Sequence, residues 1–232
     1  MNRLALAILV SLFPMPALAQ TAATLICANP ASALEKAVCA SPSLYTAYRG
    51  MEEAFRGAQR RLRGPGSDAL ARDQAAFLDS IRQGYRAAAQ ATDPEAGLGP
   101  DDELARRLRE RSDALATLSP AREGLGGAWM NFKVKLSLRP IRHDLWEANL
   151  VMDRYAINAT SCTVRLSFRK NADRSAASET DPATPGAAGG FALQLDGETL
   201  SLHRPEDVQR SCGQFFDRHA TLFRTAQWSA RD

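Results

Sequence analysis

The sequence has few of the residues from which enzyme sites and metal centres are usually built. Its 232 residues hold three histidines and four cysteines. The short motifs H-E-x-x-H, G-x-S-x-G and the phosphate-binding P-loop do not occur. The cysteines form no C-x₂-C pair and have no histidine near them, so a zinc site is disfavoured. We therefore expect a protein that is not an enzyme and that carries neither a cofactor nor a metal.

The remaining candidates for catalysis have simpler explanations. His143, His203 and His219 fall at predicted strand ends or turns, where surface histidines are expected more often than a metal triad. Cys212, within Ser-Cys-Gly, could be read as a nucleophile, but in an exported chain with an even number of cysteines a structural disulfide is favoured. A glycosidase would need two carboxylates across a cleft, which no sequence pattern here places.

The sequence also lacks an excess of charge of one sign. The formal net charge is +3, and residues 20–122 and 123–232 each carry nearly equal numbers of acidic and basic side chains. No cluster combines basic and aromatic residues in the way that single-strand nucleic-acid sites do. We expect no nucleic-acid partner.

Long hydrophobic runs are missing except at the N-terminus. Arg3 precedes an apolar run over residues 4–13, and Ala17-Leu18-Ala19 forms a small-x-small cleavage site. The run is shorter than the ~20 residues that a membrane-spanning helix needs. Residues 1–19 therefore read as a signal peptide. After cleavage, the protein would be periplasmic or secreted, with no membrane span.

Export favours disulfides, because they persist in oxidising compartments. Four cysteines allow three connectivities. We favour Cys27–Cys39 and Cys162–Cys212, because each pair then lies within one predicted domain.

Residues 20–122 predict an all-α domain of about four helices. Ser32 and Glu35 form a capping box, and Ser41-Pro42 marks a second helix start. Apolar residues then recur at helical spacing along three longer segments: Leu44, Tyr48, Met51, Phe55, Ala58 and Leu62; Leu70, Phe77 and Ile81; Leu104, Leu108, Leu115 and Leu118. In the last segment we expect the solvent-exposed face to be formed by Arg106, Arg107, Arg109 and Arg111.

Residues 123–232 change from helical to alternating periodicity near Gly126-Gly127. We expect about six mainly antiparallel strands, the first running from Met130 through Leu138 as one strand. Asp196-Gly197 between two alternating runs is a strong hairpin signal. Residues 171–190 are small, polar and rich in Pro and Gly, and predict a mobile loop. The fold class is thus α+β, with a helical bundle and a segregated small sandwich or barrel.

The first half resembles the N-terminal domain of the LprI-type lysozyme-inhibitor family over about residues 25–118. The residues that carry the resemblance are Cys27, Ala37-Val38-Cys39, Leu44, Phe55, Gln74, Phe77 and Arg82. Phe77 stands where the family usually has Trp, and the family's later cysteine is missing. The resemblance implies a protein partner, with lysozyme as the candidate, and inhibition by blockade of the enzyme cleft.

The sequence therefore leads to an exported, non-catalytic binding protein. We expect Ser41, Pro42 and Tyr45, near the corner between the first two helices, to contact the partner. The alternative is a structural or interaction module of the envelope that uses the β-rich half for an unknown partner.

Overall fold

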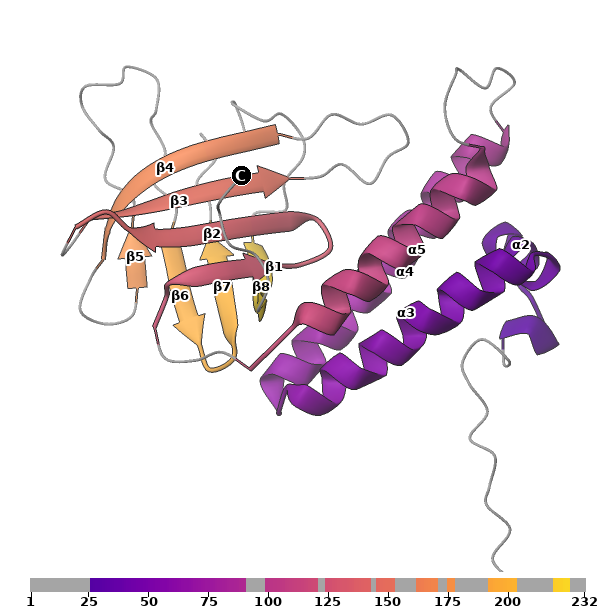
Figure 1. Cartoon of the computed structure of the whole chain (residues 1–232), viewed down its shortest axis with the longest axis horizontal. Helices are drawn as coiled ribbons and strands as arrows, with labels where there is room; N and C mark the ends of the chain where they lie inside the picture. The colour runs from indigo at the N-terminus through magenta and orange to yellow at the C-terminus, as the bar shows by residue number, and fades with distance from the viewer. Residues whose placement is uncertain are drawn as a thin grey trace, which may run out of the picture.

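The computed structural model describes residues 26–90, 99–120, 124–142, 145–152, 162–170, 175–177, 192–203 and 219–225. The expected signal peptide, Cys212 and most of the 171–190 segment lie outside these ranges. The described residues form helices and an antiparallel curled sheet, so the chain is a mixed α+β protein (Figure 1).

The helices of the first half lie beside one another, with the shortest at the end farthest from the sheet (Figure 1). Their bounds are α2 (Ala33–Ala40), α3 (Pro42–Arg61), α4 (Pro65–Gln90) and α5 (Pro100–Thr117). Both predicted helix starts are confirmed: Ser32 and Glu35 form a complete capping box, and Ser41 caps α3 ahead of Pro42 at its first turn. No helix among the described residues is long and apolar enough to cross a membrane.

The strands of the second half follow one another in space as they do in sequence. Their bounds are β1 (Gly127–Met130), β2 (Val134–Pro140), β3 (Leu145–Met152), β4 (Cys162–Lys170), β5 (Ser175–Ala177), β6 (Ala192–Asp196), β7 (Thr199–His203) and β8 (His219–Thr225). Every neighbouring pair is antiparallel, and β8 also pairs with β1, so the hydrogen-bonded order closes into a barrel. The predicted Asp-Gly hairpin is confirmed: Gly197, at a φ of +56°, turns β6 into β7.

The segment expected to be one first strand is instead a hairpin. The backbone N–H of Asn131 donates to the carbonyl of Val134, and the Asn131 side-chain oxygen accepts from the N–H groups of Lys133 and Val134. These bonds close a turn between β1 and β2, although Met130, Phe132 and Val134 alternate in sequence as a strand would. The expectation of a continuous strand was wrong, because local side-chain bonds compete with the sheet ladder. β5 is a further difference, since it lies inside the expected loop.

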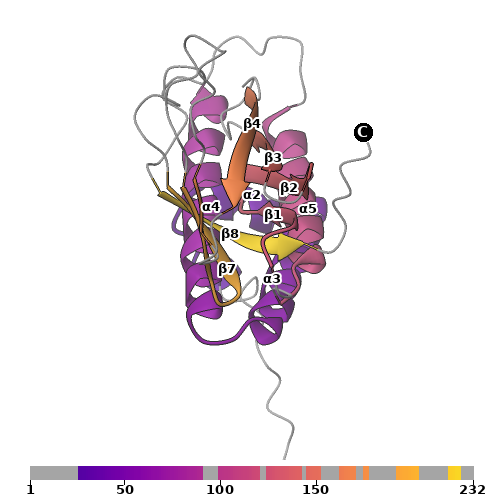
Figure 2. The same ribbon diagram turned by 90° about the vertical axis from the view of Figure 1, so that its left-hand side faces the viewer.

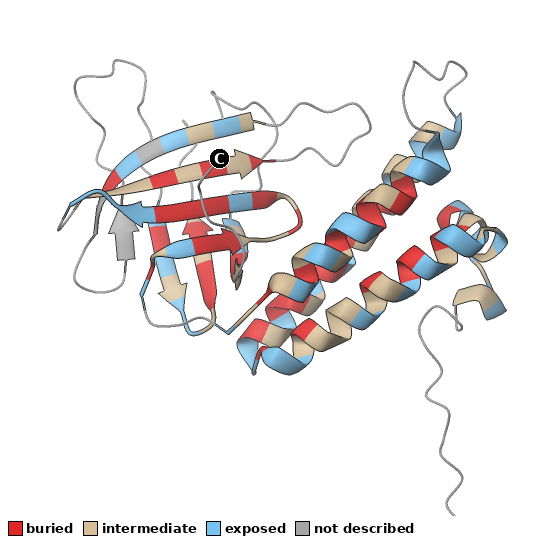
Figure 3. Ribbon diagram, in the orientation of Figure 1, coloured by how far each residue is buried: buried red, intermediate tan, exposed pale blue. Residues whose placement is uncertain are grey.

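Two groups of buried residues form the core, and Figure 3 colours the buried positions of the ribbon red. The interior of the barrel is filled by side chains from β1 to β8: Trp129, Val134, Leu136, Leu138, Ala148, Leu150, Met152, Phe168, Leu193, Leu200, Leu202 and Leu222. The second group fills the space between the helices and includes Phe132 and Phe223 from the sheet half. The two halves thus share apolar surface. Figure 2, viewed from the sheet side, shows the helices behind the sheet.

Polar contacts join the halves at two further places. Just after α5, the N–H of Ser119 donates to the carbonyl of Arg224. The hydroxyl of Thr225 donates to the hydroxyl of Thr117. At the β6–β7 turn, the carboxylate of Glu198 accepts the N–H of Arg63 at 2.7 Å. Arg63 lies two residues before Pro65, the first residue of α4, and Glu198 also lies beside Gly66 in the first helical turn. This carboxylate is therefore at the positive end of the α4 dipole.

Replacing Glu198 should therefore destabilise the protein through α4. We expect Glu198→Ala to lower the free energy of unfolding by about 1 kcal/mol, the usual value of a carboxylate at a helix N-terminus. Urea denaturation measures this. The control is Gln194→Ala, at an exposed position of β6 in the same hairpin but outside its turn. An equal loss in both variants would contradict a specific role for Glu198.

Candidate functional site

A buried ion pair lies where the helices meet the sheet. α4 contributes Asp73, Gln74 and Phe77, which share one face of the helix because residues three or four apart are neighbours. α5 contributes Arg111. The side chains of Arg111 and Asp73 are only 4% and 8% exposed, respectively. We call this group, together with Phe132 of the β1–β2 turn, the junction.

The polar side chains at the centre of the junction are hydrogen-bonded to one another. The Arg111 guanidinium donates to Asp73 Oδ2 at 2.7 Å and to Gln74 Oε1 at 2.9 Å. It also lies over the ring of Phe77, 5.3 Å from the ring centre. The Gln74 amide nitrogen in turn contacts Met51 Sδ at 2.6 Å, which connects α4 to α3. The junction therefore links three helices through one network.

The same network reaches the sheet. The backbone N–H of Phe132 donates to Asp73 Oδ1 at 3.4 Å, a long bond. The Phe132 ring meets Phe77 edge to face, with centroids 6.2 Å apart. Both carboxylate oxygens of Asp73 are thus engaged within the fold. The arrangement is suited to fixing the position of the hairpin against the helices.

Burial raises the pKa of Asp73, and the nearby Arg111 opposes that rise without cancelling it. Arg111 brings a positive charge into the junction, because the guanidinium group is charged in proteins. A permanently charged group at this depth needs Asp73 and Gln74 as partners, since an unpaired buried charge costs several kcal/mol.

Burial of this arginine corrects one prediction from the sequence. Arg107 and Arg111 were expected on the solvent face of α5, but they are only 9% and 4% exposed. A signal for Arg111 was present, since it lies seven residues after Leu104 and four before Leu115, on the leucine stripe itself. Nothing in the sequence marked Asp73 as its partner.

The residues that carry the family resemblance all belong to helix packing. Leu44, Gln74 and Phe77 are buried, and Phe55 is half-buried against the helical core. Arg82 lies 3.6 Å from Glu35 and so joins α4 to α2. These positions suit structural roles.

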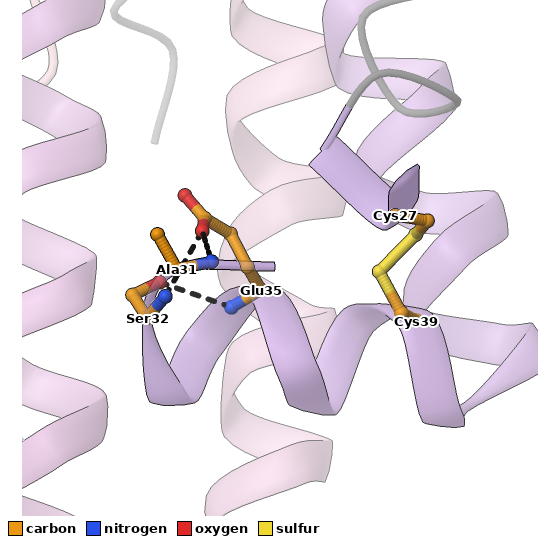
Figure 4. Close-up of a disulfide and its surroundings, with 5 residues drawn as sticks. All are labelled: Cys27, Ala31, Ser32, Glu35 and Cys39. Atoms are coloured by element: carbon orange, nitrogen blue, oxygen red, sulfur yellow. Dashed lines mark hydrogen bonds between the residues drawn. A yellow bond between two sulfur atoms is a disulfide. The ribbon is translucent and has the colours of Figure 1, made fainter. Parts of the chain in front are cut away.

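The disulfide Cys27–Cys39 predicted from the sequence is present (Figure 4). It ties the chain entering the fold to the end of α2, close to the start of α3. Cys162, at the start of β4, is also disulfide-bonded. Its expected partner, Cys212, lies outside the described residues, so that pairing stays a prediction.

The corner between α2 and α3 places the three predicted contact residues differently. Ser41 caps α3, and its hydroxyl also lies 3.0 Å from that of Ser43. Tyr45 is half-buried and packs on the helical core, whereas Pro42 is exposed. The sequence reasoning missed Ser43 and Thr46, which are exposed on the same turn. We call Pro42, Ser43 and Thr46 the corner surface.

At the start of α2, the end away from the corner, a second polar cluster fixes the helix. Glu35 accepts the N–H groups of Ala31 and Ser32 at 2.7 and 3.0 Å. Desolvation raises the pKa of Glu35, but these two bonds and the positive charge of Arg82 outweigh it, so the net shift is downward. Nearby, desolvation and the charge of Glu52 raise the pKa of Tyr48 to about 12.

Two of the three histidines are brought together, on β7 and β8. The Nδ1 atoms of His203 and His219 are 2.7 Å apart. His143 lies outside the described residues. Among the residues that are described, no group of three or more His, Cys, Asp or Glu side chains has the arrangement of a metal site.

Breaking the junction should be costly. We expect Asp73→Asn to lower the free energy of unfolding by about 3–5 kcal/mol, because Arg111 is left buried without a counter-charge. The double variant Asp73→Leu/Arg111→Met should lose at least ~1 kcal/mol less than the sum of its single variants. Urea denaturation of the unmodified protein, of Asp73→Leu, of Arg111→Met and of the double variant measures the coupling. Asp79→Asn, at an exposed site on α4, is the control and should change stability by less than about 0.5 kcal/mol.

The capping box should make stability depend on pH. The folded-state pKa of Glu35 lies below its ordinary value of 4.5, so its charge stabilises the fold above that value and less as pH falls through the folded pKa. Glu35→Gln should cost about 0.5–1 kcal/mol at neutral pH, and the difference from the unmodified protein should vanish in acid. Thermal unfolding across this range tests it, with exposed Glu53→Gln as control. A difference that is constant with pH would contradict the assignment.

No protein-family model, curated protein or solved structure matches this chain.

Proposed function

We propose that this chain is an exported, non-catalytic binding protein whose corner surface contacts a protein partner, with lysozyme as the first candidate. The observation that carries the proposal is the Cys27–Cys39 disulfide, which joins the segment before α2 to the end of α2, beside that surface. In this proposal, residues 1–19 are a signal peptide. Residues 20–122 and 123–232 act as a helical domain and a β-rich domain.

The disulfide supports export, because such bonds persist in the periplasm and outside the cell and are rare in the cytosol. The periplasm or the extracellular space is therefore the proposed location. A lysozyme would be met in the same compartments, which agrees with the partner that the family resemblance suggests.

The corner surface has the properties of a pre-organised contact. Ser41 and Pro42 begin α3 directly after α2, and Leu44 anchors the turn, since its side chain is 1% exposed. The capping box and the disulfide fix the preceding helix. A partner that binds here would not have to order the backbone, and less ordering leaves more of the contact energy as affinity.

The state of the ionisable groups supports binding over catalysis. Several carboxyls with shifted pKa have partners within the fold: Asp73 pairs with Arg111, and Glu35 with the start of α2. The pKa of Glu103 is lowered by hydrogen bonds and ion pairs with Arg106 and Arg107. Such groups are used in structure, whereas catalytic acids and bases must be open to a substrate.

A lysozyme assay tests the proposal. We expect the mature chain at micromolar excess to inhibit lysozyme, and the exposed substitutions Ser43→Arg and Thr46→Arg to weaken inhibition at least tenfold by inserting charge and bulk into the contact. Ala76→Arg, at an exposed site of α4 outside the corner surface, is the matched control and should inhibit normally.

Two results would overturn parts of the proposal. If lysozyme retains full activity with excess protein, lysozyme is not the partner. If all three arginine variants inhibit as the unmodified chain does, the partner binds elsewhere and the corner surface is not the site.

A further inference from the structure

The last residue pair of the β7–β8 ladder consists of two histidines. The antiparallel register places His203 directly opposite His219. Their rings meet edge to face, with centroids 4.7 Å apart and planes at 74°. His203 is half-buried and His219 is exposed, so solvent reaches the pair.

The strand pattern fixes the side of the sheet on which the pair lies. Successive side chains of a strand point to opposite faces. Leu202 is 1% exposed and belongs to the barrel interior. His203, its neighbour in sequence, therefore projects from the outer face, together with its cross-strand partner His219.

The two Nδ1 atoms of the pair face each other and share one proton. A contact of 2.7 Å between two Nδ1 atoms is a hydrogen bond, in which one ring donates its proton and the other presents a lone pair. A metal ion can replace that shared proton, because neutral imidazole is a common metal ligand. Two nitrogens bound tetrahedrally to zinc at 2.0–2.1 Å lie about 3.4 Å apart. The rings would need to separate by only ~0.7 Å.

We propose that His203 and His219 bind a transition-metal ion, Zn²⁺ or Cu²⁺, with water completing its coordination. Imidazole nitrogen suits these ions, whereas Mg²⁺ and Ca²⁺ prefer oxygen ligands. With two protein ligands, the site loads reversibly and is weaker than a four-ligand structural zinc site. The site is independent of the corner surface and of the identity of the protein partner.

A bound ion would connect β7 to β8 at the end of their ladder. β7 ends at His203 and β8 begins at His219. A ligand that binds only the folded chain stabilises it in proportion to its occupancy, so metal binding should raise the melting temperature.

Calorimetric titration of the mature, tag-free chain with ZnCl₂ and with CuSO₄ tests the site. We expect one ion per chain to bind in the unmodified protein and in the control His143→Ala. We expect affinity to fall at least tenfold in His203→Ala and in His219→Ala, and MgCl₂ to give no binding. Zinc should raise the melting temperature of the unmodified protein and of the control, but of neither of the other two variants.

Absence of saturable binding in the unmodified protein would overturn the proposal, as would equal affinity in all variants, which would place the ion elsewhere. If an alanine variant fails to fold, NMR of the unmodified protein decides. Zinc should then shift the imidazole ¹⁵N signals of both His203 and His219, and a titration that leaves either unchanged would overturn the site.

Discussion

The arrangement of this protein depends on the buried ion pair between Asp73 of α4 and Arg111 of α5. Taking two charges out of water costs several kcal/mol per ion unless geometry and hydrogen bonds compensate. Here the compensation comes from three directions: the Gln74 amide, the Phe77 ring and the backbone N–H of Phe132. Because all these partners must be in place together, the pair selects one packing of α4, α5 and the β1–β2 turn.

The apolar contacts around that pair explain why the halves stay together. Phe132 and Phe223 belong to the sheet half, but their side chains pack into the core between the helices. Burying side chains of this size is worth about 1.5–3 kcal/mol each. The ion pair and these aromatic side chains therefore both hold the sheet half against the helices. Glu198 and Thr225 add polar contacts between the two halves.

Most other ion pairs of the described residues lie nearer the surface and contribute less. Glu147 on β3 pairs with Arg139 and Arg165 of the neighbouring strands, but those arginines are 60% and 74% exposed. Exposed pairs are typically worth 0–1 kcal/mol. Such pairing fits the near balance of acids and bases along the chain.

The two proposed binding sites lie on different parts of the fold. The corner surface is at the end of the helices farthest from the sheet (Figure 1), whereas the histidine pair is on the barrel. A partner at one site need not cover the other.

The sequence by itself determined the features that depend on neighbouring residues. The capping box at Ser32, the proline start of α3, the Asp-Gly hairpin and the Cys27–Cys39 disulfide follow from residues within about a dozen positions of one another. Only the tertiary structure decided that Arg111 is buried, that Phe132 completes the helical core and that His203 meets His219. These outcomes depend on partners 16 to 59 positions away, and no local pattern specifies which distant side chain supplies the counter-charge, the ring or the second imidazole.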